Sequence, residues 1–428
     1  MATLYVLAAA SMGVVALLFA LLLFEPDLPY ELSSPLPGLE VPQFPGLLAS
    51  WVDAPLHADS QVTLLSGGER FYGAELEAIA GARHSIHLEA YIFRRSAIAE
   101  RFIEALAERA RQGVRVRLVL DAYGCLFTPE GCFARLREVG GDVRRYQPLD
   151  WGTLKRINNR THRELLVVDG RVAFVGGAGV AGWWTDGTRG LPPWQDLVVR
   201  VEGPLAASVQ ACFMENWLES SGEILADPAD FPSAGHAPGD SPPGAAVGFV
   251  VVSTPSAARS TRARILFQTL VSAARRSIAI QSPYFLPAPR MLEALTAARR
   301  RGVSVEIMVP GRHSNHPIAR RASRRRYGAL LGEGVAIHEY LPGMIHSKLL
   351  IVDRLWTVTG STNFDNRSFR LNDEVNLVVR DAGLAAQARE QFEADLLSCE
   401  AVTLEAWHRR PGSERALAWL GTLIERQV

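Results

Sequence analysis

Hydrophobic and polar residues follow the same order twice along this chain of 428 residues. In each copy, a stretch of alternating hydrophobic and polar residues, typical of a strand, is followed by a helical segment and then by a second strand. In the first copy, Ile86, Leu88 and Ala90 fall on one face of the leading strand. The three segments are residues 82–93, 97–112 and 113–121 in the first copy, and residues 274–285, 290–301 and 302–310 in the second.

The order strand, helix, strand predicts right-handed crossovers and a parallel or mixed sheet covered by helices. We therefore expect an α/β protein of two similar halves, each a mixed β-sheet flanked by helices, packed about a pseudo-twofold axis. The first half is expected over residues 61–225, and the second half, with C-terminal helices, over residues 249–428. Residues 226–248 are rich in Pro, Gly, Ala and Ser, which favours a linker.

The N-terminus has a different pattern, because residues 2–24 contain no charged side chain. As a helix this stretch would be about 35 Å long, enough to cross a bilayer core of about 30 Å. A cleaved signal peptide is the alternative, although it would carry a basic start and a shorter apolar core. We expect a transmembrane helix over residues 1–25 and a Pro-rich tether over residues 26–60, and hence a single-pass membrane protein. Because no Lys or Arg precedes Arg70, the sequence does not indicate the membrane side of the remaining chain.

Composition adds two constraints. The chain is 48% hydrophobic and 21% charged, and its formal net charge is zero, so no overall positive field attracts a polyanion. This argues against a dedicated nucleic-acid-binding protein. Arginine supplies nearly all the positive charge, and the only lysines are Lys155 and Lys348. Against that background, Lys348 indicates a position where a compact ammonium group is needed.

The strongest chemical pattern is the string HSKLLIVD, which begins at His346 and ends at Asp353. His346 and Lys348 are two residues apart, so on a strand their side chains point the same way. The string GSTN follows, with Ser361 and Asn363. An imidazole, an ammonium and an amide at one point suit an anionic phosphate, because the cation neutralises it while the imidazole attacks phosphorus or transfers a proton.

The first half carries the same string in altered form, HRELLVVD, from His162 to Asp169. Glu164 occupies the place of the lysine, and the later string GGAG ends in Gly179 where GSTN ends in Asn363. A carboxylate facing a phosphate would repel it, since two unit charges about 4 Å apart interact by roughly 4 kcal/mol at an effective dielectric constant near 20. The first half therefore lacks part of a phosphate-binding set.

Three arrangements would relieve this repulsion. Glu164 could be protonated, it could be paired with a cation, or the first half could have stopped binding phosphate. We favour pairing with Arg160 or Lys155, because Arg163 is adjacent on the strand and should point away. If the paired site is slow, Glu164→Lys should raise its activity.

The two strings resemble the phospholipase D superfamily, in which His-x-Lys-x4-Asp is followed by Gly-Ser/Gly-x-Asn, twice in the lipid-acting members. The strings VEGPLAASVQACFMENW, SPYFLP, NFDNRS and NDEVN resemble its bacterial cardiolipin synthase-like branch. The resemblance implies a two-step transfer without a metal or other cofactor. One histidine attacks a phosphodiester to form a phosphohistidine, the other protonates the leaving alcohol, and an alcohol or water then releases the phosphatidyl group. It further implies a monomer acting at a membrane on a glycerophospholipid such as phosphatidylglycerol, and no nucleic acid.

In that family an acidic residue downstream of each histidine orients the imidazole, and the matching residues here are Asp196 and Glu374. A carboxylate on one ring nitrogen raises the basicity of the other. The expected catalytic residues are His162, His346, Lys348, Asp169 and Asp353, and the expected supporting residues are Asn363, Ser361, Asp196, Glu374 and Glu164.

Two questions stay open on the sequence alone. A basic segment over residues 312–328 places Arg320, Arg321, Arg324 and Arg325 on one helical face, where they either attract lipid headgroups or are simply solvated. The altered first half also leaves three functions to weigh. A membrane-anchored phosphatidyltransferase or phospholipase is favoured, a catalytically degenerate lipid-binding protein is the alternative, and a nucleic-acid phosphodiesterase is disfavoured by charge and by the anchor.

Overall fold

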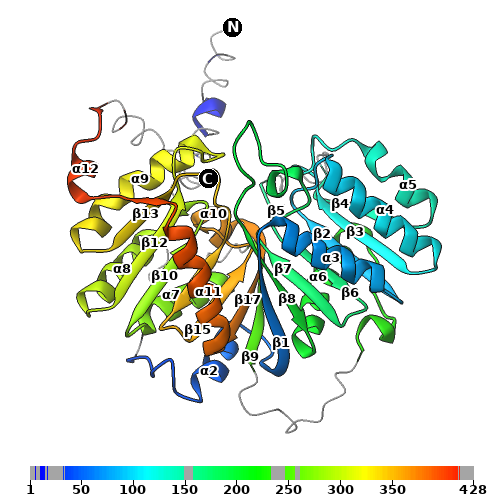
Figure 1. The fold of residues 1–428 in the computed structure, drawn as a ribbon, viewed down its shortest axis with the longest axis horizontal. Helices are drawn as coiled ribbons and strands as arrows, with labels where there is room; N and C mark the ends of the chain where they lie inside the picture. The colour runs from blue at the N-terminus through cyan, green and yellow to red at the C-terminus, as the bar shows by residue number, and fades with distance from the viewer. Residues whose placement is uncertain are drawn as a thin grey trace.

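The computed structural model describes residues 5, 10–14, 17, 32, 34–148, 158–232, 246–255, 261–412 and 414. Within them, two α/β halves lie side by side and share one mixed sheet, with β1 and β9 at the centre (Figure 1). The expected α/β fold with two similar halves is therefore confirmed.

The first half begins with a long strand and ends with the helix that covers the back of its sheet. Its elements are β1 (His57–Ser66), α3 (Gly68–Gly81), β2 (Ser85–Ala90), α4 (Ala97–Arg111), β3 (Arg115–Asp121), η1 (Glu130–Phe133), α5 (Ala134–Glu138), β4 (Asp142–Tyr146), β5 (Arg160–Thr161), β6 (Leu165–Val168), β7 (Val172–Gly176), η3 (Gly182–Trp184), β8 (Leu197–Glu202), α6 (Pro204–Ser221) and η4 (Pro228–Asp230).

The second half repeats this order. Its elements are β9 (Ala246–Ser253), α7 (Arg262–Ala273), β10 (Ser277–Gln281), β11 (Phe285–Leu286), α8 (Pro289–Arg300), β12 (Ser304–Pro310), α9 (Pro317–Gly332), β13 (Ala336–Tyr340), β14 (Leu349–Val352), β15 (Trp356–Gly360), β16 (Phe364–Asp365), α10 (Asn366–Arg370), β17 (Asn372–Arg380), α11 (Ala382–Leu396), β18 (Cys399–Ala401) and α12 (Leu404–His408).

The strand order is the same in both halves when it is read from the outer edge to the centre. It is β4-β3-β2-β6-β7-β8-β1 in the first half and β13-β12-β10-β14-β15-β17-β9 in the second, with β18 added at the edge. The halves are joined more closely than two separately packed sheets, because β1 pairs with β9 at His57–Gly248 and Ser60–Ala246. In Figure 1, α3 covers the near face of one half and α11 the near face of the other, while α6 and α7 lie behind, as a pseudo-twofold axis requires.

Strand β2 is buried on both faces rather than one. Ile86 and Leu88 face the core under α3 and α4. On the opposite face, the His87 ring stacks on Phe213 of α6 with ring centroids 4.8 Å apart. The alternation in β2 therefore does not indicate a solvent-exposed face. One face of the strand packs under α3 and α4, and the other packs against α6.

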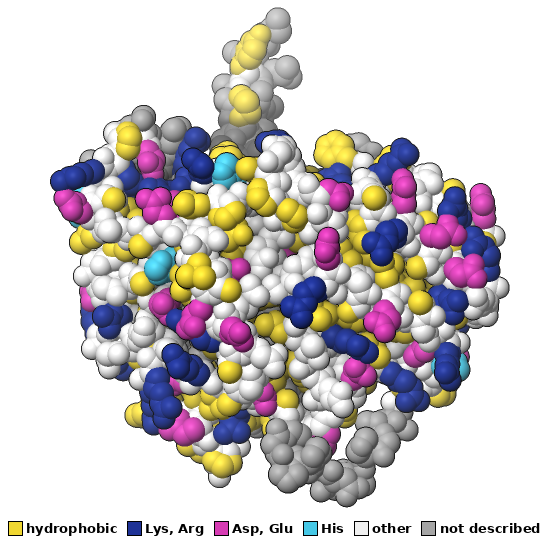
Figure 2. Space-filling model, in the orientation of Figure 1, with side chains coloured by type: hydrophobic (Ala, Val, Ile, Leu, Met, Phe, Trp, Pro, Cys, Tyr) yellow, Lys and Arg dark blue, Asp and Glu magenta, His cyan; other side chains and the backbone are white. Residues whose placement is uncertain are grey.

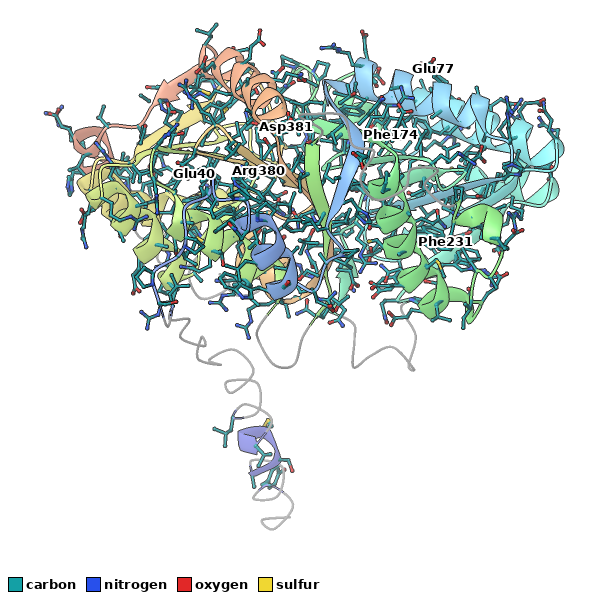
Figure 3. All side chains as sticks on the ribbon, turned by 90° about the horizontal axis from the view of Figure 1, so that it is seen from below. Glu40, Glu77, Phe174, Phe231, Arg380 and Asp381 are labelled. Atoms are coloured by element: carbon teal, nitrogen blue, oxygen red, sulfur yellow. The ribbon has the colours of Figure 1, made fainter. Side chains whose placement is uncertain are left out.

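The N-terminal tether expected over residues 26–60 is wrong for its second part. Helix α2 (Phe44–Trp51) buries Phe44 and Leu48 in the core of the second half. Trp356 donates from Nε1 to the Leu39 carbonyl at 3.2 Å, and Arg380 donates to the Glu40 carbonyl at 3.0 Å, at the contact labelled in Figure 3. The segment had no hydrophobic period because it is short and docks through a few large side chains.

The outer segments of the chain are described only in part. The transmembrane helix expected over residues 1–25 lies mostly outside the described residues, and among those that are described no helix combines the length and hydrophobicity of a membrane span. Residues 233–245 of the expected linker also lie outside them. Before that gap, Arg115 binds Asp230 at 3.3 Å, so the start of the linker is attached to the first half.

The two motif aspartates are structural, which corrects their expected place among the catalytic residues. Asp353, just after β14, accepts hydrogen bonds from the backbone N–H groups of Arg275, Arg276 and Ser277 at 2.7–3.2 Å. Asp169 does the same for residues 83–85 in the first half. Each carboxylate therefore holds the start of β2 or β10, at the end of the motif strand away from the histidine.

This role predicts that Asp353→Ala destabilises the second half without removing a catalytic group. The loss of charged hydrogen bonds to three backbone donors should lower the free energy of unfolding by about 2–3 kcal/mol. Asp353 also has φ of 54°, which Asn tolerates better than Ala, so Asp353→Asn should lose less. Urea unfolding and activity per folded molecule check this, and an Asp353→Asn variant that is fully stable yet inactive would contradict it.

Candidate active site

Two short strand pairings bring the histidines of the two halves together. Strand β5 of the first half pairs in parallel with β17 of the second, and the His162 N–H donates to the Asp373 carbonyl at 2.9 Å. In return, Ile345 forms a parallel bridge to Gln195, and the His346 N–H donates to the Gln195 carbonyl at 2.7 Å. Each histidine is therefore fixed on the backbone of the opposite half.

These pairings exchange the acidic partners. His346 Nδ1 lies 2.8 Å from Asp196 Oδ2, and His162 Nδ1 lies 3.2 Å from Glu374 Oε2. The family resemblance supplied the right acids but suggested that each one serves the histidine that it follows in the sequence. Instead, Asp196 of the first half orients His346, and Glu374 of the second half orients His162. Because an ionised carboxylate only accepts, it holds the proton on Nδ1 and leaves the lone pair on Nε2.

His346 lies in the more enclosed half of the site. The Trp184 and Trp194 ring centroids lie 5.7 and 5.4 Å from its ring, and Trp184 Nε1 donates to Asp196 Oδ2 at 3.1 Å. Burial and the nearby Lys348 charge lower the pKa of His346 to about 4, against the opposing effect of Asp196. His346 is therefore neutral at physiological pH. The sequence analysis missed both tryptophans, whose only signal was a clustering of aromatic residues before Asp196.

Lys348 lies against this imidazole, as its spacing from His346 predicted. Its Nζ is 2.8 Å from the His346 carbonyl oxygen, 2.8 Å from Nδ1 of the ring and 3.1 Å from Nε2. Burial lowers the pKa of Lys348 to about 8, while the carboxylates of Asp196 and Glu374 act in the opposite direction. Between about pH 4 and 8, the site thus combines a neutral His346 with a charged Lys348.

The groups that hold the His162 ring are more polar than those around His346. Ser361 donates from its hydroxyl to Glu374, so it acts through the carboxylate rather than on a substrate. Burial alone would raise the pKa of Glu374, but the His162 charge and these hydrogen bonds hold it below its usual value. The Tyr91 ring lies edge-on to His162 with centroids 5.1 Å apart, a neighbour that the sequence did not indicate.

Asn363 is 4% exposed, and its Oδ1 is a buried oxygen without a hydrogen-bond partner among the described residues. Its backbone N–H is held by the Ser368 hydroxyl at 3.2 Å. An unpaired buried polar atom costs free energy unless a ligand or water satisfies it. The Oδ1 atom of Asn363 is thus available to a hydrogen-bond donor on a bound molecule or to water.

Among the described residues, Glu164 does not form the ion pair with Arg160 that we favoured. The Arg160 guanidinium lies 4.7 Å from the centre of the Tyr123 ring, and Lys155 lies outside the described residues. Glu164 Oε1 instead accepts from the Ile92 N–H at 3.2 Å. Burial raises the pKa of Glu164 well above its usual range, so the protonated alternative fits best. Arg163 points away, as expected, and binds Glu215 at 2.8 Å.

The basic segment at α9 is also only partly available to lipid. Arg320 binds Glu339 at 2.7 Å, and Arg324 binds both Glu339 and Glu414. These two arginines are occupied within the protein, so neither the headgroup interpretation nor the simply solvated one holds for them.

Two imidazoles from opposite halves, each with a carboxylate on Nδ1, form an arrangement that can transfer a group between a nucleophile and a leaving group. Lys348 lies against one of these rings. On a duplicated α/β fold, this arrangement defines a phospholipase D-like protein. The family model "Cardiolipin synthase, PLD-like domain" matches residues 76–191 and 267–396, more than half of the chain, which therefore belongs to this family.

Curated relatives place the chain in the cardiolipin synthase-like branch. It is 34% identical to cardiolipin synthase A of Pseudomonas aeruginosa over 378 residues, which cover 87% of this chain and 74% of that protein. It is 32% identical to the major cardiolipin synthase ClsA of Bacillus subtilis over 82% of this chain and 72% of that protein. The crystal structure of phosphatidylserine synthase from Haemophilus influenzae superposes with a TM-score of 0.70 at 13% identity, over 91% of this chain and 100% of that one, which shows the same fold.

The geometry predicts the protonation state of His346. It should stay neutral from about pH 5 upwards, with its proton on Nδ1, because burial and Lys348 lower its pKa to about 4. Long-range 15N–1H NMR of 15N-histidine-labelled protein measures both properties, with His346→Ala to assign the signal. Asp196→Asn should lower the pKa further and increase the Nε2–H tautomer. A His346 that titrates near pH 6.5 would contradict this environment.

Proposed function

We propose that the chain makes cardiolipin by transferring a phosphatidyl group from one phosphatidylglycerol to the hydroxyl of another. The observation that carries the proposal is the exchanged pair of carboxylate–imidazole hydrogen bonds, which occupies Nδ1 of both rings and leaves the Nε2 atoms for the reaction. The family membership supports the reaction class, and the names of the relatives support the acceptor. Hydrolysis, with water as acceptor, is the competing outcome.

His346 is assigned as the nucleophile, because it is neutral and lies beside the only lysine among the described residues. Its Nε2 attacks phosphorus, a P–N bond forms, and the P–O bond to the glycerol headgroup breaks. His162, which carries a second proton on Nε2 at this stage, gives that proton to the leaving glycerol oxygen. The hydroxyl of a second phosphatidylglycerol then attacks phosphorus, His162 takes up its proton, and the P–N bond breaks to release cardiolipin.

Lys348 and Asn363 are assigned to the phosphate. The Lys348 ammonium lies beside Nε2 of His346, where an oxygen of an attacked phosphate would also lie. A fixed ammonium in a buried site stabilises charge on the phosphate oxygens more strongly than it would in water. Asn363 is assigned to the same group through its Nδ2 donor, since its Oδ1 is not held by a partner among the described residues.

The first prediction of this mechanism is chemical. Purified protein with phosphatidylglycerol should yield cardiolipin and glycerol, also in the presence of EDTA, and a quenched reaction should contain phosphatidyl-His346 in a peptide detected by mass spectrometry. His346→Ala should lower turnover by at least about 1,000-fold while the protein stays folded. Activity that persists in His346→Ala, or that EDTA removes, would refute the mechanism, and phosphatidic acid as the main product would make the enzyme a phospholipase.

A rim of exposed apolar side chains surrounds the same edge of the sheet. Thr161, next to His162, donates its N–H to Asp121 at the end of β3, and Tyr123 and Phe127 follow in the next loop. Phe127 is 78% exposed. Further exposed hydrophobic side chains lie after β3, after β12 and after β13; they are Leu126, Ile318 and Leu341.

We infer that this rim contacts a lipid bilayer. Arginines accompany the aromatic rings, since Arg160 lies over Tyr123 and Arg94 lies over Phe127 at 5.2 Å from its centroid. Aromatic and basic side chains together suit an interface with anionic headgroups. On the face shown in Figure 2, positive and negative side chains are interspersed with hydrophobic ones, in keeping with a net charge of zero.

The rim predicts that the double change Leu126→Asp and Phe127→Asp weakens binding to vesicles that contain phosphatidylglycerol, because it removes apolar contacts and adds repulsion. Sedimentation of a chain that lacks residues 1–31 should show at least about a fivefold loss of binding. Ile224→Asp is the matched control. Ile224 is 67% exposed next to Glu223, whose carboxylate binds Arg117 near the start of β3, away from the rim. Equal binding by both variants would exclude this face.

A further inference from the structure

Gly179 occupies the position of Asn363 in the other half. Val180 forms a parallel bridge to Phe93, and the corresponding pairing in the second half joins Phe364 to Phe285. The residue before each pairing is Gly179 in the first half and Asn363 in the second. The first half thus has no amide at the point where the second half has one.

No side chain fits at Gly179, because the backbone carbonyl of Ile92 is in the way and the carboxyl group of Glu164 lies close beside it. A Cβ atom on Gly179 would lie 2.8 Å from Glu164 Oε1 and 2.9 Å from Ile92 Cβ, and it would overlap the Ile92 carbonyl oxygen. Distances this short force neighbouring atoms to move. Glu164 is therefore seated where an asparagine side chain would begin, with Oε1 on the Ile92 N–H.

The surroundings of Glu164 favour its neutral form. Tyr72 and Glu75 on α3 and Asp196 before β8 are on the same side, and Lys348 of the other half is the cation that faces it. Burial outweighs Lys348 and the backbone donors, and raises the pKa of Glu164 well above its usual range. A neutral carboxylic acid offers one acceptor oxygen and one O–H donor, the same pair that a primary amide offers.

We propose that Glu164 replaces the missing asparagine amide rather than the missing lysine. Its carbonyl oxygen accepts from the Ile92 N–H, and its O–H donates to an oxygen of the phosphate bound between the two halves. Within the part of the chain that the structure describes, Lys348 then supplies the cationic contact of the site. This assignment rests on the proposed function, since it concerns how the same site holds the phosphate of a phosphatidyl group.

The assignment reverses the effect expected of restoring lysine. An ammonium at position 164 would be buried beside the Ile92 N–H donor and would face Lys348, so Glu164→Lys should damage the site. Glu164→Gln keeps one acceptor and one donor in the same shape and should preserve it. Glu164→Met keeps the volume without a strong donor or acceptor, and it should bind phosphate more weakly.

The experiment compares wild type, Glu164→Gln, Glu164→Met and Glu164→Lys, with Asp230→Asn as the control for a change at a buried carboxyl away from the site. The readouts are kcat and KM for phosphatidylglycerol in mixed micelles, the dissociation constant of inorganic phosphate by calorimetry, and the thermal midpoint. We expect Glu164→Gln and the Asp230→Asn control to stay within about threefold of wild type in kcat/KM. Glu164→Met should lower kcat/KM by about 10- to 100-fold, and Glu164→Lys should lower it further.

Two results would overturn the inference. If Lys is more active than wild type, with Gln between them, then Glu164 is ionised and repels phosphate. If Met matches wild type in kcat/KM and in phosphate affinity, then Glu164 only fills space. If the wild-type protein turns over phosphatidylglycerol or binds phosphate, the variants test the role of Glu164 independently of the proposed function. If the wild-type protein does neither, both the proposed function and this inference are overturned.

Discussion

The hydrogen bonds from His346 to Asp196 and from His162 to Glu374 are the constraint on which the rest of this structure depends. Each joins an imidazole of one half to a carboxylate of the other. Neither half can therefore orient its own histidine, and the duplicated scaffold forms one site instead of two. The central pairing of β1 with β9 and the short parallel pairings around the histidines fix the halves in the one relative position that allows both bonds.

The halves are similar in topology and unequal in chemistry. A phosphodiester carries one negative charge, and Lys348 already supplies one buried positive charge beside His346. A second buried ammonium would have to be desolvated without a second charge to balance it. The replacement of lysine by Glu164, whose pKa is raised by burial, is thus compatible with a working site. The two imidazoles also have different environments, because Trp184 and Trp194 enclose His346.

Much of this arrangement could be predicted from the sequence, because it depends on periodicity and on repeated strings. The two halves, the leading strands and helices, and the meeting of His346 with Lys348 all follow from local spacing. The place of Asp353 was also readable in principle: a strand of four residues spans about 13 Å, which carries the aspartate to the far end from His346. Asp353 was predicted to be catalytic because it belongs to the same motif as His346.

The remaining features depend on contacts that spacing does not encode. The exchange of Asp196 and Glu374 is set by pairings only one or two residues long between segments far apart in the chain. The docking of α2 depends on a few large side chains in a Pro-rich segment without a period. The environment of Glu164 depends on the absence of a side chain at Gly179, and an absent side chain carries no signal until its neighbours are known.

The most direct test of the composite site is a crystal structure of the protein with orthovanadate, which mimics a phosphoryl group under attack. We predict vanadium bonded to Nε2 of His346, with Nε2 of His162 on the opposite side and Nζ of Lys348 on an equatorial oxygen. Asp196 and Glu374 should keep their hydrogen bonds to the two Nδ1 atoms. Vanadate held by His346 alone, with His162 turned away from it, would contradict the claim that the two halves form a single catalytic unit.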